Sequence, residues 1–281
     1  MAYRAPLDDI RLALDAAAGL SDLIADGTLQ GVDADTADAV LEGAAKFAEE
    51  ELAPIDAGGD TAGSKLVDGK VVTPPGWEAA YKAFAAAGWS SLSGTEDFGG
   101  QHLPHVLASS AIEIWCGASL AFGLCPLLTQ GAVEAIRYAA TPELKARYLP
   151  KMVAGEWTGT MNLTEPQAGT DLGALKTKAV PQSDGSYRIF GSKIFITYGD
   201  HEMTSNIIHL VLARLPDAPV GTKGISLFLV PKVLVNDDGT LGARNDLRAA
   251  SLEHKLGIHA SPTCVMLFGD CLLYTSDAAD E

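Results

Sequence analysis

The hydrophobic and polar positions in the first half of the chain repeat with the period of an α-helix. Residues 11–20 and 34–52 are rich in alanine, and in the second segment the apolar side chains fall near one face with acidic side chains opposite. Pro54 is predicted to end that helix because proline carries no backbone N–H. The glycines and prolines of residues 56–75 predict a loop that can include one short hairpin. The chain is therefore expected to begin with amphipathic helices.

The next segments continue the helical pattern with larger side chains. Trp77, Tyr81 and Phe84 follow the spacing of one helix face, which predicts a helix with a buried aromatic stripe. Residues 104–140 are unusually apolar and predict helices buried inside a bundle. The sequence Thr141-Pro142-Glu143 then marks a helix start, with a hydroxyl N-cap, proline at the first position and an acid near the positive end of the helix dipole.

The pattern changes near residue 156, where helical periodicity gives way to short apolar runs. Runs rich in β-branched and aromatic residues alternate with turn signals and cover residues 157–164, 175–180, 187–197, 206–215, 223–230 and 263–268. The pair Asp184-Gly185 between two of these runs predicts a hairpin. We therefore expect an α+β fold, in which an all-α helical domain of residues 1–156 precedes a β-domain of residues 157–270.

Composition excludes several classes of protein. The chain of 281 residues is 47% apolar and 20% charged, which is ordinary for a globular protein. Its 36 acidic and 20 basic residues give a net charge of −16, so neither nucleic acid nor an anionic membrane is an expected partner. The N-terminus is acidic and residues 118–128 are too short to span a bilayer. A cytoplasmic protein is expected, with reduced thiols at Cys116, Cys125, Cys264 and Cys271.

The densest group of candidate functional residues is residues 161–171, an apolar run that breaks into a polar turn. Thr164, Glu165, Thr170 and Asp171 lie there with a proline and a glycine, which suits either a binding site or a solvated turn that caps a strand. No glycine-rich phosphate loop follows a strand, so a Rossmann nicotinamide site is not predicted. No cysteine or histidine set has zinc-ligand spacing, so no metal site is predicted.

Ordered motifs along the chain resemble those of the acyl-CoA dehydrogenase family. They occur in residues 141–151, 155–157, 163–171, 193–197, 224–231 and 253–263. The resemblance covers nearly all of residues 1–270. The start of the chain and Asn162 are similar in particular to the branch that contains 3-(methylthio)propanoyl-CoA dehydrogenase.

The resemblance implies an FAD enzyme that desaturates an acyl-CoA thioester between its α and β carbons, with hydride transfer to flavin N5. It implies cofactor contacts at Met161, Asn162, Leu163, Thr164, Gly169, Thr170, Phe195, Ile196 and Thr197. It implies substrate contacts at Thr170, Ser261 and Thr263. Electron-transfer flavoprotein is the implied electron acceptor, and a homodimer or homotetramer is the implied assembly.

Several residues also have a purely structural interpretation or depart from the family pattern. Phe195 alone would be an ordinary inward strand residue. Glu165 and Asp171 resemble an acid/base pair but are expected to cap a turn, since the family does not use them as the base. Asn162 replaces a small residue, and His259 replaces an arginine that many relatives carry, so a phosphate contact from that position would be weaker and pH-dependent. The alternative for His259 is a histidine that simply packs in the loop.

The end of the chain departs from the family. Residues 271–281 do not continue the motifs, and we expect them to be foreign to the fold. A C-terminal helical bundle that supplies the catalytic glutamate in relatives is expected to be missing, so no catalytic residue is predicted in this chain and the fragment is expected to be inactive. The alternatives are an acyl-CoA oxidase, a flavin monooxygenase, a DNA-associated alkylation-response relative, which the charge of −16 disfavours, and a purely structural interaction module.

Overall fold

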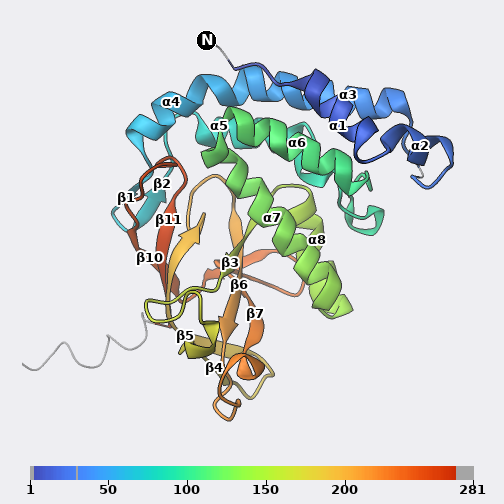
Figure 1. Cartoon of the computed structure of the whole chain (residues 1–281). Helices are drawn as coiled ribbons and strands as arrows, with labels where there is room; N and C mark the ends of the chain where they lie inside the picture. Colours follow the sequence, from blue (N-terminus) through green and yellow to red (C-terminus); the bar gives the residue numbers. More distant parts are fainter. Residues whose placement is uncertain (1–2, 30, 270–281) are drawn as a thin grey trace, which may run out of the picture.

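The computed structural model describes residues 3–29 and 31–269, and in it a layer of helices covers one end and one side of a set of strands (Figure 1). The expected foreign tail, residues 271–281, lies outside the described residues. Within the described part the helices precede the main strands, as expected for an α+β fold. The helices are α1 (Leu7–Ala16), α2 (Leu20–Ala25), α3 (Ala34–Phe47), α4 (Ala53–Ala62), α5 (Trp77–Ala86), α6 (His105–Ala118), α7 (Leu120–Ala139) and α8 (Pro142–Val153).

Two predictions about the first helices were wrong. The expected helix of residues 11–20 is divided into α1 and α2, because Gly19 adopts a left-handed conformation with φ 66°. Pro54 does not end the helical segment: a single π-helical turn, Ala48–Leu52, leads into α4, where Pro54 lies in the first turn. Proline is tolerated there because the first N–H groups of a helix have no intrahelical acceptor.

The predicted short hairpin and helix cap are present. Strands β1 (Lys65–Val67) and β2 (Lys70–Val72) pair antiparallel across Asp68 and Gly69, which both have positive φ, as a tight hairpin turn requires. At α8, the Thr141 side chain accepts a hydrogen bond from the Leu144 N–H, so the predicted N-cap is confirmed.

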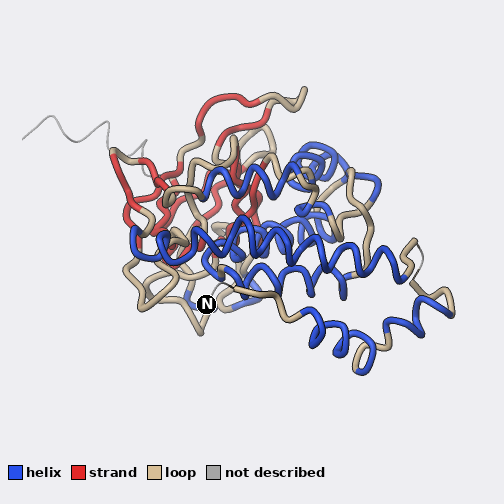
Figure 2. Tube along the Cα trace, turned by 90° about the horizontal axis from the view of Figure 1, so that it is seen from above, coloured by secondary structure: helices blue, strands red, loops and turns tan. Residues whose placement is uncertain are grey.

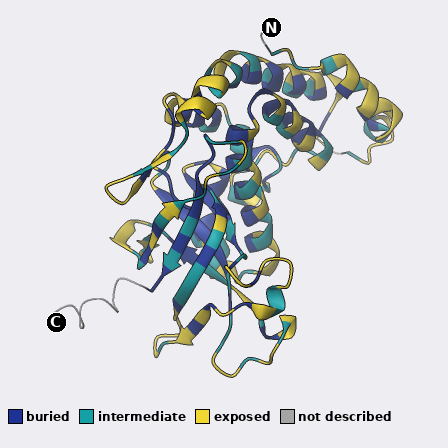
Figure 3. Ribbon diagram, turned by 60° about the vertical axis from the view of Figure 1, so that its left-hand side comes forward, coloured by how far each residue is buried: buried dark blue, intermediate teal, exposed yellow. Residues whose placement is uncertain are grey.

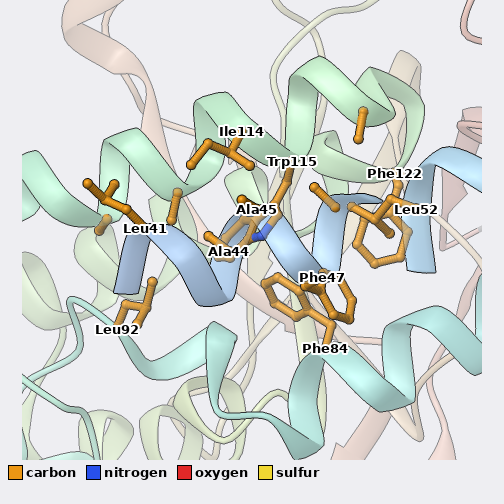
Figure 4. Packing of buried hydrophobic residues seen from close by; sticks show 14 of the residues in the cluster. Leu41, Ala44, Ala45, Phe47, Leu52, Phe84, Leu92, Ile114, Trp115 and Phe122 are labelled. Carbon is orange, nitrogen blue, oxygen red and sulfur yellow. The ribbon is translucent and has the colours of Figure 1, made fainter. Parts of the chain in front are cut away.

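The core of the helical part is built from aromatic, branched aliphatic and small side chains (Figure 4). Trp77, Tyr81 and Phe84 are all at most 2% exposed, which confirms the predicted aromatic stripe. Phe84 packs edge-to-face on Trp115 of α6, with ring centroids 4.8 Å apart. Alanines of α3 allow α6 to approach closely, so the alanine-rich pattern and the aromatic pattern form one core.

The main strands form two sheets that pack on each other. The first sheet has the order β3 (Trp157–Asn162), β6 (Asn206–Ala213) and β7 (Ser226–Pro231), with β3 parallel to β6. The second is antiparallel, with the order β10 (Leu247–Leu252), β11 (Thr263–Phe268), β5 (Tyr187–Thr197) and β4 (Lys178–Pro181). A separate hairpin joins β8 (Val233–Val235) to β9 (Leu241–Arg244). Seen from above, the strands gather at one end of the helical layer (Figure 2).

The first sheet is buried on both faces. Ile208 and Leu210 of β6 belong to a cluster with α7 and α8, whereas Val211 and Ala213 pack in the cluster shared with the second sheet. On β3, Gly159 lets α7 approach, since a Cβ added there would lie 2.5 Å from the Cβ of Ala132. Figure 3 shows buried and intermediate residues along the strands and exposed residues mainly in the loops and on the outer faces of the helices. The ends of β3 and β5 are therefore held on a rigid support.

Candidate functional site

The end of β3 and the end of β5 lie side by side and bring the candidate residues together. The Ile194 N–H donates a hydrogen bond to the Thr164 carbonyl oxygen over 2.9 Å. The Thr160 hydroxyl donates to the Thr197 carbonyl oxygen over 2.6 Å. The turn of residues 163–171 and the segment of residues 193–197 thus form one continuous surface, although they are far apart in sequence.

Phe195 occupies a β-bulge in β5. Cys264 of β11 is paired with Ile196 but Met266 is paired with Lys193, so β5 contains one extra residue at this point. Phe195 has φ 58°, a left-handed conformation that is unfavourable for an aromatic residue, and its side chain is 53% exposed. The bulge turns the ring outward instead of into the core. Strain of this kind occurs mainly where the surrounding structure maintains it for function.

The end of β5 is anchored to the helices directly after the bulge. Ile196 is 2% exposed and packs between the two sheets. Tyr198, which also has positive φ, donates its hydroxyl hydrogen to the Ala121 carbonyl oxygen over 2.7 Å and accepts a hydrogen bond from the Trp77 indole N–H over 3.1 Å. The position of Phe195 and Thr197 is therefore determined by buried neighbours on both sides.

Glu165 is buried in the turn and forms an ion pair there. Its carboxylate lies 2.9 Å from the Lys193 ammonium and accepts the backbone N–H groups of Lys176 and Thr177. Burial alone would raise the pKa of this carboxyl, but the hydrogen bonds from Thr177, Lys176 and Lys193 outweigh it and lower the pKa to about 2. Such an acid stays ionised and fully engaged, which agrees with the expectation that Glu165 is not a general base.

Lys193 begins the motif of residues 193–197, and the sequence alone predicts no role for it. Its side chain is fully buried, and its ammonium donates to the Leu163 carbonyl oxygen over 3.0 Å as well as to Glu165. Burial lowers the pKa of this lysine, while the contact with Glu165 raises it. The sequence offers one signal for this role, namely that the charged Lys193 directly precedes the apolar residues 194–196 of a predicted strand. A charge that is buried with such a strand requires a partner.

The exposed polar groups of this surface suit the flavin that the resemblance implies. The Thr164 backbone N–H, the Thr164 hydroxyl and the Thr197 hydroxyl donate to no other described residue. Thr164 and Thr197 are both half-buried. Phe195 directly follows Ile194, which is bonded to Thr164, and precedes Thr197 by two residues in β5. A planar aromatic ring with a polar edge would find a phenyl face and unused donors here, so the residues fit such a group.

Met161 and Asn162 direct their side chains away from this surface. Met161 packs against the cluster formed with α7 and α8. Asn162 is fully buried between the sheets, where its amide nitrogen lies 3.3 Å from Nδ1 of His209. Burial lowers the pKa of His209 to about 3, so this pair is uncharged. Both residues can therefore contribute only backbone groups at the candidate site.

The remaining candidate residues lie at two other places. Gly169 and Thr170 are exposed in the turn, and Asp171 accepts the Gly173 N–H over 2.8 Å as a local cap. Ser261 and Thr263 are buried beside a hollow of about 360 Å³ between the end of α4 and residues 253–263. The Ser261 hydroxyl has no hydrogen-bond partner among the described residues.

Two histidine and cysteine expectations are also resolved by the structure. His259 is half-buried, and its Nδ1 lies 3.1 Å from the Asp60 carboxylate, so it joins α4 to the β-domain loop. The sequence interpretation that this histidine packs in the loop agrees with this contact. Cys116, Cys125 and Cys264 are free thiols, and Cys271 lies outside the described residues.

The geometry agrees with the comparison to known proteins. A model of the acyl-CoA dehydrogenase N-terminal domain matches residues 34–156, and a model of the acyl-CoA dehydrogenase middle domain matches residues 160–271. The chain belongs to the acyl-CoA dehydrogenase family, and the resemblance drawn from its motifs and the expected fold class are confirmed. No helix in the described ranges is long and apolar enough to cross a membrane.

Two relatives show which members of the family this chain is similar to. The chain is 48% identical over 274 residues to 3-methylmercaptopropionyl-CoA dehydrogenase of Ruegeria pomeroyi, which covers 98% of this chain and 47% of that protein. It is 44% identical over 240 residues to a butyryl-CoA dehydrogenase of Syntrophomonas wolfei, covering 84% of this chain and 39% of that protein. The chain therefore spans about half the length, or less, of these relatives.

Solved structures show the same fold. Butyryl-CoA dehydrogenase from Megasphaera elsdenii superposes with a TM-score of 0.68 at 25% identity, over 85% of this chain and 57% of that one. An acyl-CoA dehydrogenase from Bacillus anthracis complexed with FAD gives a TM-score of 0.67 at 20% identity, over 86% of this chain and 37% of that one. At 20% identity, the similarity to the Bacillus anthracis structure shows the fold alone.

Proposed function

We propose that this chain is the N-terminal and middle part of an FAD-dependent acyl-CoA dehydrogenase that introduces a double bond between the α and β carbons of an acyl-CoA thioester. The observation that carries this proposal is the strained, outward-facing Phe195 beside the unused donors of Thr164 and Thr197. The 48% identity to 3-methylmercaptopropionyl-CoA dehydrogenase favours 3-(methylthio)propanoyl-CoA as the substrate.

In this proposal the residues of the β3 and β5 ends hold the isoalloxazine ring. The backbone of residues 161–164 and the Thr164 hydroxyl would hold its pyrimidine edge, and Phe195 and Thr197 would contact the ring system from β5. Ile196 is buried between the sheets and could contribute only its backbone. Gly169 and Thr170, which are exposed in the turn, would contact the pyrophosphate or the CoA chain. FAD held there would supply the hydride acceptor, and the Thr164 donors would stabilise negative charge at the pyrimidine edge.

The acyl group of the substrate would contact apolar and hydroxyl side chains. Leu120 and Leu127 of α7 are 49% and 41% exposed, and Leu124 and Gly131 lie on the same helix face. The carbonyl oxygen of Ala121 in the same helix accepts a hydrogen bond from the Tyr198 hydroxyl at the end of β5. The start of α7 therefore lies near the proposed ring site. Thr170, Ser261 and Thr263 are the proposed substrate contacts. An apolar wall that excludes water favours removal of the α proton and the β hydride.

The other parts of the proposal concern the whole protein. We propose a division into a helical domain, residues 1–156, and a flavin-holding β-domain, residues 157–270. The catalytic base is proposed to lie in the part of the relatives that this chain does not cover, since the chain spans 47% of 3-methylmercaptopropionyl-CoA dehydrogenase. Glu165, the buried acid of the turn, is held ionised in an ion pair and does not suit that role. A cytoplasmic homodimer or homotetramer that passes electrons to electron-transfer flavoprotein is proposed; one similar structure is titled as an electron transferring flavoprotein, with a TM-score of 0.69 at 28% identity.

The test requires a protein with the missing half of the relatives' length. Residues 1–268 can be joined to the C-terminal half of the Ruegeria pomeroyi relative, and the product purified with FAD. Anaerobic addition of 3-(methylthio)propanoyl-CoA is expected to bleach the visible absorbance of the oxidised flavin and to form the α,β-unsaturated thioester. Bound FAD without bleaching by this substrate or by butyryl-CoA would refute the proposed reaction. The 281-residue chain alone is expected to be inactive.

A further inference from the structure

The buried Lys193 connects the two segments that the proposed function assigns to the flavin. Its ammonium reaches the Leu163 carbonyl oxygen at 3.0 Å and the Glu165 carboxylate at 2.9 Å, so it holds the turn after β3 on both sides of Thr164. In its own strand, Lys193 lies two residues before Phe195, at the last regular pair before the bulge. Lys193 thus contacts the turn after β3 through its side chain and belongs through its backbone to the segment of residues 193–197.

We infer that Lys193 is a positioning residue, which sets the separation between the Thr164 donors and the Phe195 ring through its bonds to Leu163 and Glu165. This inference rests on the proposed flavin site. It adds the contact that fixes the turn of residues 163–171 relative to the segment of residues 193–197. The Lys193 side chain is fully buried, so it would act on the flavin site through Leu163 and Glu165 and not by contact with the ring.

The need for such a contact follows from the backbone of the two segments. The left-handed conformation of Phe195 is intrinsically unfavourable, so the bulge would relax if its neighbours allowed it. Among the described residues, one other hydrogen bond joins the turn to the bulge, from the Ile194 N–H to the Thr164 carbonyl oxygen. The Thr160 hydroxyl joins β3 itself to Thr197, beyond the bulge. Glu165 in turn is fixed by the N–H groups of Lys176 and Thr177. Lys193 therefore connects the bulge to Glu165, whose position is fixed independently by these two N–H groups.

The same domain contains a matched pair that lacks this connection. Lys232 forms an ion pair with the buried Asp200, and its ammonium also donates to the His201 carbonyl oxygen over 2.8 Å. Each lysine thus contacts one buried carboxylate and one backbone carbonyl. The Lys232 pair touches neither the turn of residues 163–171 nor Phe195, so its loss disturbs the domain without disturbing the proposed arrangement of the two segments.

The experiment compares Lys193→Met with Lys232→Met in the joined holoprotein described above. Both substitutions remove an ammonium that pairs with a buried carboxylate and nearly keep the volume of the side chain, so both are expected to lower the urea midpoint. Only Lys193→Met is expected to raise the dissociation constant for FAD, by roughly tenfold or more, since a displaced donor is worth about one hydrogen bond to a charged or polar group. It is also expected to make the flavin reduction potential more negative than in the control.

The outcomes separate this inference from the proposed function. Equal effects of the two substitutions on FAD affinity and on reduction potential, at equal loss of stability, would show that Lys193 is only structural and would overturn the inference. If the unsubstituted joined protein binds no FAD, the proposed function itself fails. If Lys193→Met does not fold, Glu165→Gln, which weakens the same contact but keeps a neutral acceptor, is expected to show a smaller change in the same two readouts. No change in either readout would overturn the inference.

Discussion

Glu165 allows the electrostatic account of the turn to be tested on the chain itself, through the substitution Glu165→Gln and its dependence on pH. The carboxyl is 3% exposed and its pKa of about 2 lies below the usual 4.5. That difference corresponds to about 3 kcal/mol of folding stability at neutral pH. Replacing the acid also leaves Lys193 without a charged partner, and breaking a buried ion pair typically costs about 3–5 kcal/mol.

The sign of the pH effect follows from the direction of the shift. A carboxyl with a lowered folded pKa contributes its full stability above the unfolded pKa, near 4.5, and loses it as the pH falls toward 2. The difference between the native chain and Glu165→Gln should therefore be constant from about pH 7 to pH 6 and shrink by about 2 kcal/mol at about pH 3. The glutamine does not titrate, so it serves as the flat reference.

Urea unfolding at several pH values measures this difference. Glu156→Gln is the matched control, because Glu156 is 54% exposed in its ion pair with Lys151 and should change stability by less than about 1 kcal/mol. The double substitution of Glu165 by Gln and Lys193 by Met is expected to recover part of the loss, since it removes the unpaired charge. A difference between the native chain and Glu165→Gln that does not vary between pH 7 and pH 3 would refute the ion-pair account.

Three further substitutions test other parts of the structure. Phe195→Gly should leave folding stability unchanged or raise it by about 1 kcal/mol, because glycine accepts the left-handed conformation, yet it should weaken FAD binding in the joined holoprotein; a clear loss of stability would contradict the strain assigned to the bulge. Gly159→Ala should cost about 1–3 kcal/mol in urea unfolding, because the added methyl meets Ala132 of α7, and an unchanged midpoint would mean that α7 does not pack so closely on β3. Thr141→Ala should cost about 1 kcal/mol through loss of the cap on Leu144, whereas Thr141→Ser should retain most of it.

The local pattern of the chain was sufficient to predict the identity of most elements. The aromatic stripe of α5, the cap of α8, the hairpin across Asp184-Gly185 and the strand Thr263–Phe268 all occur where the sequence placed them. These features depend on helical spacing, capping and turn conformation. Each of these is determined by residues a few positions apart, so a short stretch of sequence is enough to predict it. The wrong predictions at Gly19 and Pro54 also concern helix ends, where neighbouring packing decides whether the chain continues.

The sequence by itself determined the two-part architecture and, through its motifs, the family. The tertiary structure alone decided which way each candidate side chain points. Met161 and Asn162 face the interior because β3 is buried on both faces, whereas Phe195 faces outward because one extra residue in β5 changes the alternation of the strand. The pairing of Glu165 with Lys193 joins residues 28 positions apart, and no local pattern encodes such a contact, since it forms only when two strands meet.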